Sequence, residues 1–168
     1  MKNYVVRLEN GKEKTFEQFK KVANAAYSGL VPPAQVLSAM GAVVVKLPST
    51  AEDVTAERDR RLKAGVVVTV TGYGDIPMQG RSQDMINTLS LKDTARDLKA
   101  AGITAAIIPF RDANNTLHSL TADQVIEMVN AGKMKASQIY QVAWDMKDGT
   151  GDFTGGIPDD FTDDKWWP

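Results

Sequence analysis

Short apolar runs bounded by turn residues predict several short β-strands along the chain. The clearest run is residues 66–71, Val-Val-Val-Thr-Val-Thr, because β-branched side chains favour extended backbone. Asp112 and Asn114 lie in a predicted tight turn, where such side chains bond their own backbone, and residues 116–120 would pair back beyond it. Further strands are predicted at residues 4–8, 42–47, 76–79 and 104–110. The pattern therefore predicts a small antiparallel or mixed sheet.

Apolar residues at helical spacing, with capping residues before them, predict helices between these strands. Ser49 and Glu52 have the spacing of a capping box, which predicts a helix over residues 49–63. This helix is heavily charged, so we expect it to pack along a narrow apolar stripe and to be mostly solvated. Another helix is predicted over residues 82–101, with a restart near Ser90.

The chain from Thr121 onward predicts a pair of helices. Thr121 and Gln124 form a second capping box, and the helix that they begin would end at Gly132. The next helix would begin at Met134 or Lys135, and a short loop would lay the two side by side as a helical hairpin. The expected fold class is α+β, a small sheet packed with helices and a helical hairpin near the C-terminus.

Composition divides the chain into three expected parts. Residues 1–48 predict a strand–helix–strand unit, in which Thr15 would cap the helix, and residues 49–148 form the expected α+β domain. Residues 149–168 hold four glycines and few aliphatic residues, so we expect a flexible arm without a core of its own. The arm has one basic and five acidic residues, a formal charge of −4, which leaves +3 for the rest. A chain without this arm should remain folded.

Charge and composition exclude several classes of function. The formal net charge of −1 leaves no basic footprint for nucleic acid. The chain has no cysteine, which excludes disulfides and thiolate metal sites and fits synthesis in a reducing cytoplasm. No apolar run is long enough for a signal peptide or a membrane span, so we expect a soluble protein without a membrane partner.

Candidate catalytic and metal-binding residues are few. His118 is the single histidine and has no nucleophile pattern near it. Two carboxylate pairs, Glu57 with Asp59 and Asp112 with Asp123, are of the type that glycoside hydrolases use. The segment that begins at Asp112 mimics a calcium loop but lacks the glycine and the closing glutamate of such loops. We therefore expect no enzyme, no metal and no other cofactor. The expected structural turn and cap residues are Asp112, Asn114, Thr121 and Gln124.

Aromatic residues near the end of the chain are the candidate partner-docking residues. Two neighbouring indoles, Trp166 and Trp167, expose a large apolar area unless they find a pocket. With Phe153 and Phe161 they give the acidic arm the build of a docking peptide, in which a few large anchors carry the affinity. Two interpretations stay open: these residues insert into a partner, or they fold back as a staple on their own domain.

Five short blocks between Val54 and Asp148 resemble those of a known family. They are Glu57-Arg58-Asp59-Arg60-Arg61 with Leu62 and Gly65; Gln79-Gly80-Arg81 with Asp84, Asn87 and Leu89; Phe110-Arg111-Asp112 with Asn114 and His118; Leu120-Thr121; and Tyr140 with Ala143-Trp144 and Lys147-Asp148. In order and spacing, these blocks are similar to an uncharacterised domain family of short bacteriophage tail and tail-fibre-associated proteins.

The resemblance implies a structural role in a phage particle. It implies a virion protein of the distal tail, a fibre or baseplate adaptor that contacts other phage tail proteins and forms a homo-oligomer. Such a protein would be made in the host cytoplasm and end in the virion. The alternative is a tail-fibre assembly chaperone that the virion does not retain, and a glycan or cell-wall hydrolase is the remote alternative. The family offers no catalytic residues to carry over.

Overall fold

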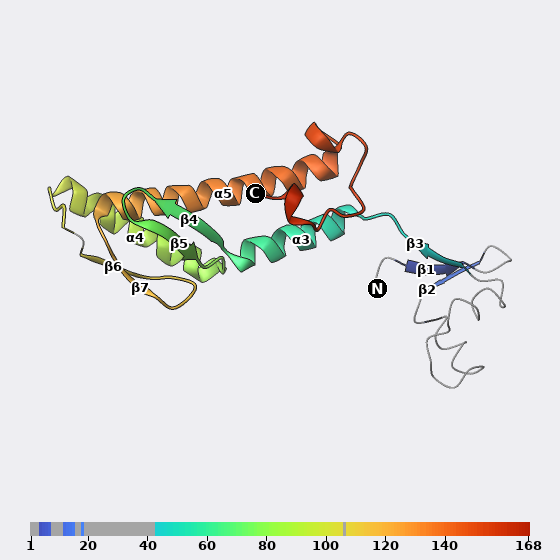
Figure 1. Cartoon of the computed structure of the whole chain (residues 1–168), viewed down its shortest axis with the longest axis horizontal. Coiled ribbons are helices and arrows are strands. Elements are labelled where there is room, and N and C mark those ends of the chain that lie inside the picture. Colours follow the sequence, from blue (N-terminus) through green and yellow to red (C-terminus); the bar gives the residue numbers. More distant parts are fainter. Residues whose placement is uncertain (1–3, 8–11, 16–17, 19–42, 106) are drawn as a thin grey trace. The chain divides into compact units, whose positions relative to one another are not determined.

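The computed structural model describes residues 4–7, 12–15, 18, 43–105 and 107–168. The chain divides into two compact units, Met1–Ser49 and Thr50–Pro168, whose helices and strands are labelled in Figure 1. A sheet forms the described part of the first unit. Helices and hairpins form the second unit.

The described part of the first unit is a three-stranded antiparallel sheet in the order β2–β1–β3. An ion pair of 2.7 Å between Arg7 and Glu13 joins β1 to β2, a strand that the sequence pattern did not predict. Most of the helix expected after Thr15 lies outside the described residues. The strands are β1 (Tyr4–Arg7), β2 (Glu13–Thr15) and β3 (Val43–Lys46).

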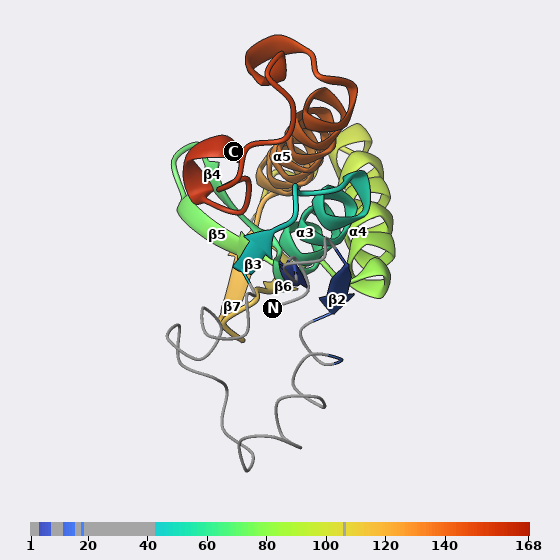
Figure 2. The same cartoon turned by 90° about the vertical axis from the view of Figure 1, so that its right-hand side faces the viewer.

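The second unit, described except at residue 106, contains three α-helices and two antiparallel β-hairpins, which confirms the α+β class. In chain order the elements are α3 (Ala51–Ala64), β4 (Val66–Val70), β5 (Gly74–Met78), α4 (Ser82–Ala100), β6 (Ile108–Arg111), β7 (Leu117–Leu120), α5 (Ala122–Asp148), η1 (Gly151–Phe153) and η2 (Asp164–Trp166). Figure 2 shows α4 and the β4–β5 hairpin on different sides of α5. None of the described helices combines the length and apolar character needed to cross a membrane.

α5 is one continuous helix of 27 residues, so the predicted helical hairpin is wrong. Gly132 lies in its interior and is buried. A Cβ at this position would lie 2.9 Å from Met78 Sδ, so glycine permits the close approach of β5 instead of ending the helix. The helix ends at Gly149, whose φ of 66° is the left-handed conformation that often terminates helices.

Side-chain hydrogen bonds to the backbone cap the starts of α3 and α5, whereas α4 begins without such a cap. Thr121 and Gln124 form the capping box of α5, with bonds of 3.2 and 2.9 Å. The capping box of α3 consists of Thr50 and Asp53, one residue later than predicted. α4 runs without interruption through Ser90, whose hydroxyl donates to a carbonyl one turn earlier (3.2 Å), so the predicted restart is wrong.

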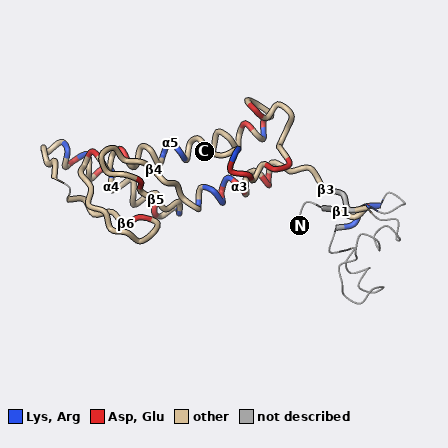
Figure 3. The backbone as a smooth tube through the Cα atoms, viewed as in Figure 1, with Lys and Arg blue, Asp and Glu red and all other residues tan. Residues whose placement is uncertain are grey.

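α3 packs along a narrow stripe, as its composition predicts. Basic and acidic residues follow one another along it (Figure 3), and its buried residues are Val54 and Glu57. The Glu57 carboxylate accepts hydrogen bonds from Arg60 and Arg61 at 2.6 and 2.7 Å. These bonds compensate the burial of a charge, which would otherwise be costly.

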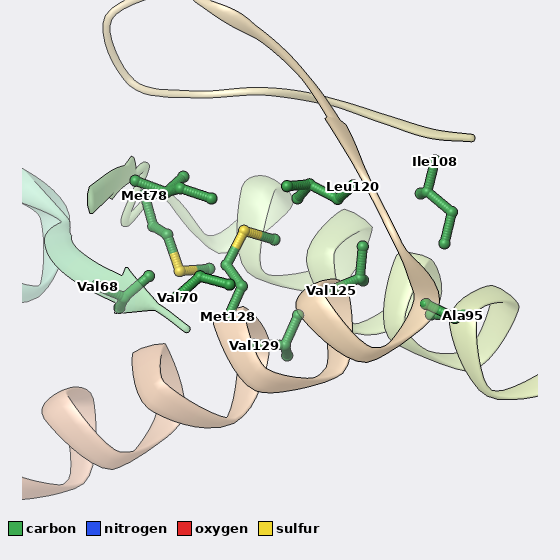
Figure 4. Packing of buried hydrophobic residues seen from close by; sticks show 11 residues of the cluster. Val68, Val70, Met78, Ala95, Ile108, Leu120, Val125, Met128 and Val129 are labelled. Atoms are coloured by element: carbon green, nitrogen blue, oxygen red, sulfur yellow. The ribbon is translucent and has the colours of Figure 1, made fainter. Parts of the chain in front are cut away.

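The first core lies where the two hairpins meet α4 and α5 (Figure 4). Along β4 alternate side chains point inward, which buries Val68 and Val70. α5 supplies Val125, Met128 and Val129, whose spacing places them on one helix face. The remaining buried members are Ile76, Met78, Ala95, Ile108, Leu120 and Ala122.

The second core includes the C-terminal arm, so the expectation that the arm is flexible and contributes no core is wrong. Its buried residues are Phe153, Phe161 and Trp167 from the arm, Val54 from α3, and Ile139, Ala143 and Met146 from α5. The Trp167 indole also donates to the Phe161 carbonyl oxygen at 2.6 Å. A few large aromatic side chains supply the apolar area that the average composition of the arm lacks.

Two glycines, here called the glycine pinch, let the end of α3 touch the end of β5. Gly80 follows β5, and a Cβ there would lie 1.7 Å from the Leu62 carbonyl oxygen. Gly65 follows α3, and a Cβ there would lie 2.0 Å from the Met78 carbonyl oxygen. Both obstacles are backbone atoms, which cannot rotate aside as a side chain can. The packing therefore requires glycine at both positions.

We predict that Gly80→Ala destabilises the second unit, because the added methyl group overlaps a backbone carbonyl. Overpacking of this kind costs about 1–3 kcal/mol. The melting temperature of the purified chain, followed by circular dichroism, should fall accordingly. Gly155→Ala is the matched control, because no atom lies within 4 Å of a Cβ at Gly155. Equal melting temperatures for the two variants would contradict the pinch.

Trp167→Ala should destabilise the chain far more than Trp144→Ala. Trp167 is 7% exposed in the second core, whereas Trp144 is 49% exposed on α5. Truncating a buried tryptophan costs about 3–5 kcal/mol, while a surface substitution costs about 0.5 kcal/mol. Thermal unfolding of both variants measures the difference.

Removal of residues 149–168 should also lower the melting temperature, and an unchanged value would show that the arm is dispensable for folding.

Candidate partner-binding surface

α4 carries two apolar stripes, and one of them is exposed. The buried or partly buried stripe packs on the first core and consists of Leu91, Ala95 and Leu98. Met85, Ile86 and Leu89 form the second stripe, and they are 49%, 57% and 45% exposed. A single exposed apolar residue is ordinary, but three on adjacent turns form a patch that is typical of binding surfaces.

An apolar groove lies beside this exposed stripe. It has a volume of about 360 Å³ and is formed by the start of α4, the middle of α5 and the glycine pinch. α4 contributes Met85 and Leu89, and α5 contributes Gly132, Ala136 and Tyr140. Binding pockets typically enclose about 300–1,000 Å³, so this hollow, called here the α4–α5 groove, is large enough to receive side chains of a partner.

Two aromatic side chains extend the apolar surface along α5. Tyr140 lines the groove, and its ring centroid lies 5.8 Å from that of Trp144 one turn further on. The Arg58 guanidinium lies 5.2 Å from the Tyr140 ring centroid, and Asp59 binds Arg58 at 2.6 Å. This cation–π contact holds the tyrosine from α3. Tyrosine, tryptophan and arginine are the residue types that most often carry affinity in protein interfaces.

Positive charge lies next to the groove. Lys133 lines it, and the structure gives this lysine no ion pair among the described residues. Lys92 lies between α4 and α5, where its Nζ donates to the Asn130 side-chain oxygen. Burial lowers the pKa of Lys92, and the nearby charges of Arg96 and Lys133 lower it further, whereas Asp93, the partner of Arg96, opposes this shift. Lys133 is the one charged residue among those that line the groove, so the lining carries a net positive charge.

A chain of hydrogen bonds, here called the hairpin clamp, joins the tips of the two hairpins. The Asp112 carboxylate is buried, and its Oδ1 accepts from the Asn114 and Thr116 amides at 2.9 and 2.8 Å. Its Oδ2 lies 3.1 Å from His118 Nε2, and His118 Nδ1 lies 3.0 Å from the Tyr73 hydroxyl. Burial alone would raise the pKa of Asp112, but the hydrogen bonds from His118 and the two amides outweigh it and lower the pKa.

The carboxylates considered for hydrolysis are engaged in other contacts. The hydrogen bond from Arg60 has the largest effect on the pKa of Glu57 and lowers it. Burial raises this pKa, but the hydrogen bonds from Arg60 and Arg61 together outweigh burial. Asp59 and Asp123 each bind a basic side chain, and the fourth carboxylate belongs to the hairpin clamp. Among the described residues, no group of three or more histidine, aspartate or glutamate side chains is arranged to hold a metal ion.

A smaller hollow of about 240 Å³, lined by both polar and apolar residues, lies between α4 and β6. Its lining includes Gln79 and Arg111. Gln79 Nε2 donates to the Asp112 carbonyl oxygen at 3.3 Å, and Arg111 Nη1 donates to the Asn115 carbonyl oxygen at 2.9 Å. Both side chains thus form hydrogen bonds to backbone carbonyl groups of the β6–β7 hairpin.

The aromatic residues of the arm pack on their own domain. Phe153, Phe161 and Trp167 are buried in the second core. Trp166 is half-buried with its ring centroid 5.4 Å from that of Phe153, and its Nε1 donates to Asp160 at 3.0 Å. The structure therefore shows the second interpretation, in which these residues staple the arm to its own domain, whereas the stripe beside the α4–α5 groove leaves apolar side chains exposed.

The sequence indicates that α4 has two apolar faces, but helical periodicity alone does not show which of them is exposed. Residues at 85, 86 and 89 fall on one side of a helix, and those at 91, 95 and 98 fall on the opposite side. One core cannot bury both sides of the same helix. Counting the faces separately would have identified one stripe as a surface, although not which one. Tyr73 of the hairpin clamp had no such signal.

Comparison with known proteins places the second unit in a family. A family model described as a domain of unknown function, DUF4376, matches residues 48–163. The chain belongs to the DUF4376 family. The DUF4376 segment includes the α4–α5 groove, the hairpin clamp and the arm as far as Asp163. It extends further than the resemblance seen in the sequence, which ends at Asp148. No curated protein matches the chain, and no solved structure matches it.

We predict that the free energy of unfolding of the DUF4376 domain falls at acidic pH because Asp112 becomes protonated. Because the folded-state pKa is lowered, ionised Asp112 stabilises the fold above its unfolded-state pKa, and this contribution is lost as the pH falls through the folded-state pKa. Asp112→Asn should lower the melting temperature near neutral pH, and the difference from the unmodified chain should narrow in acid. Asp123→Asn, at an exposed residue, is the control. The same narrowing in both variants would contradict the clamp.

Proposed function

We propose that this DUF4376 protein is a structural component of a bacteriophage virion that joins fibre or baseplate proteins of the distal tail. The observation that supports it best is the exposed stripe of Met85, Ile86 and Leu89 beside the α4–α5 groove, since such a surface favours a protein that works by contact. Its partners would be other phage tail proteins. It would be made in the host cytoplasm and enter the virion in several copies related by symmetry.

Blocks of the phage-tail resemblance meet at the groove. Leu62 and Gly65 belong to the first block, Gly80 and Leu89 to the second, and Tyr140 to the last. These positions are far apart in the sequence but line one surface. The residues that carry the resemblance therefore include those that shape the groove, which supports a role in binding.

Simple energetics show how much of this surface a partner must cover. Full burial of a leucine, isoleucine or methionine side chain stabilises by about 1.5–3 kcal/mol, and the three side chains of the stripe are already half-covered. Association itself costs roughly 4–15 kcal/mol. The stripe alone does not offset this cost. A stable contact must also bury Tyr140 and Trp144, which lie next to the groove.

Purified particles of the phage that encodes the chain test the proposal. Mass spectrometry should find the protein in a fixed ratio to other tail proteins. Leu89→Ser should reduce its incorporation by about tenfold, which corresponds to the loss of one interface anchor. Leu89 is half-exposed in the free protein, so this variant should still fold.

Leu117→Ser is the matched control, because Leu117 is exposed on β7 and does not line the groove. If both variants are incorporated into particles to the same extent, the groove has no role in assembly. A protein that is missing from particles, or far below stoichiometric, would instead be the tail-fibre assembly chaperone, and the virion role would be wrong.

A further inference from the structure

We propose that the α4–α5 groove binds an acidic amphipathic helix of a partner protein, with apolar side chains in the groove and carboxylates on its rim. This inference rests on the proposed function, because it names the kind of segment that the same surface would bind. It goes beyond that function by specifying the charge and the secondary structure of the occupant.

The apolar part of the groove suits a helix. Its walls come from α4 and α5, so an added helix would extend an existing helical layer in the usual helix-in-groove manner. Such a helix presents anchors at helical spacing on one face. Leu89 from α4 and Tyr140 from α5 would contact these anchors from the two walls.

The charge of the rim specifies the partner. Lys133 lines the groove and has no ion pair among the residues that the structure describes. Lys133 lies close enough to Lys92 for its positive charge to act on that lysine, whereas the charge of Arg96 is paired with Asp93. Carboxylates on a bound helix would relieve this repulsion and gain ion pairs that are partly shielded from solvent. Charge complementarity of this kind selects partners and speeds their association.

A second copy of the chain is a poorer occupant. In a two-fold contact each copy would bring the same positive rim, with its own Lys133, to the other. The acidic arm has suitable charge, but Phe153, Phe161 and Trp167 are buried in the second core of the same chain. These two occupants fit less well, so the complementary charge is assigned to a different protein.

Selection from a peptide library tests the proposal with the full-length chain. The probe is a yeast-displayed library of peptides of about 18 residues, five helical turns, with leucine or phenylalanine at helical spacing and randomised polar positions. Enriched peptides should carry aspartate or glutamate beside the apolar face. Their affinity should fall by about tenfold or more for Leu89→Ser and for Lys133→Glu, as for interface anchors.

Matched variants distinguish the groove from general surface charge or stickiness. Leu117→Ser and Lys135→Glu should leave the affinity unchanged, because Leu117 lies outside the groove and Lys135 lines a different hollow with Arg60 and Arg61. A selected peptide whose glutamates are changed to lysine should bind Lys133→Glu better than the unmodified chain. Circular dichroism should show that all four variants are folded.

Three results would overturn the proposal. They are a selection that yields no binder, enriched peptides without an acidic bias, and binding that the control variants weaken as much as the groove variants. Light scattering could give a fourth contradicting result. If the unmodified chain is a dimer and Leu89→Ser makes it monomeric, the groove is a contact between copies of the chain. None of these results bears on whether particles contain the protein, so failure here is distinguishable from failure of the proposed function.

Discussion

Close backbone contact around Met78 is the constraint on which the second unit depends. At this residue β5 ends between α3 and α5, and glycines face it on both sides. A Cβ at Gly65 would lie 2.0 Å from its carbonyl oxygen, and a Cβ at Gly132 would lie 2.9 Å from its sulfur. Three elements thus approach more closely than larger residues would permit. Gly65 and Gly80, which make the close backbone contacts, also line the α4–α5 groove, so backbone packing fixes part of its floor.

From this contact α5 extends into both cores, and the arm completes the second one. Arg61 ties the arm to α3: its Nη2 donates to the Thr162 carbonyl oxygen at 2.7 Å, and its guanidinium lies 5.0 Å from the Trp167 ring centroid. Arg61 also pairs with Asp164 at 2.9 Å. The opposite charges of the arm and the remaining chain therefore meet in a specific contact. An acidic, glycine-rich segment packs here because Arg61 binds its backbone and its carboxylate, and because the second core buries its aromatic side chains.

Signals that act within a few residues could be read from the sequence, whereas those set by distant neighbours could not. Thr121 lies three residues before Gln124, so both partners of that cap are visible in one short window. In the sequence Gly132 looks like the end of a helix. The residue that requires glycine there, Met78, lies 54 positions earlier in the chain and outside any local window. Leu89 falls at helical spacing like a core residue, and only the packing of α4 shows that its face is exposed.

The groove combines a fixed floor with replaceable walls. Its floor uses backbone contacts at the glycine pinch, which any substitution would disturb. Its walls use side chains such as Met85 and Leu89, which remain half-exposed and so contribute little to the cores. A rigid floor reduces the ordering cost of binding, and wall residues can change without unfolding the domain. A surface divided in this way can be adapted to a new partner by side-chain changes alone.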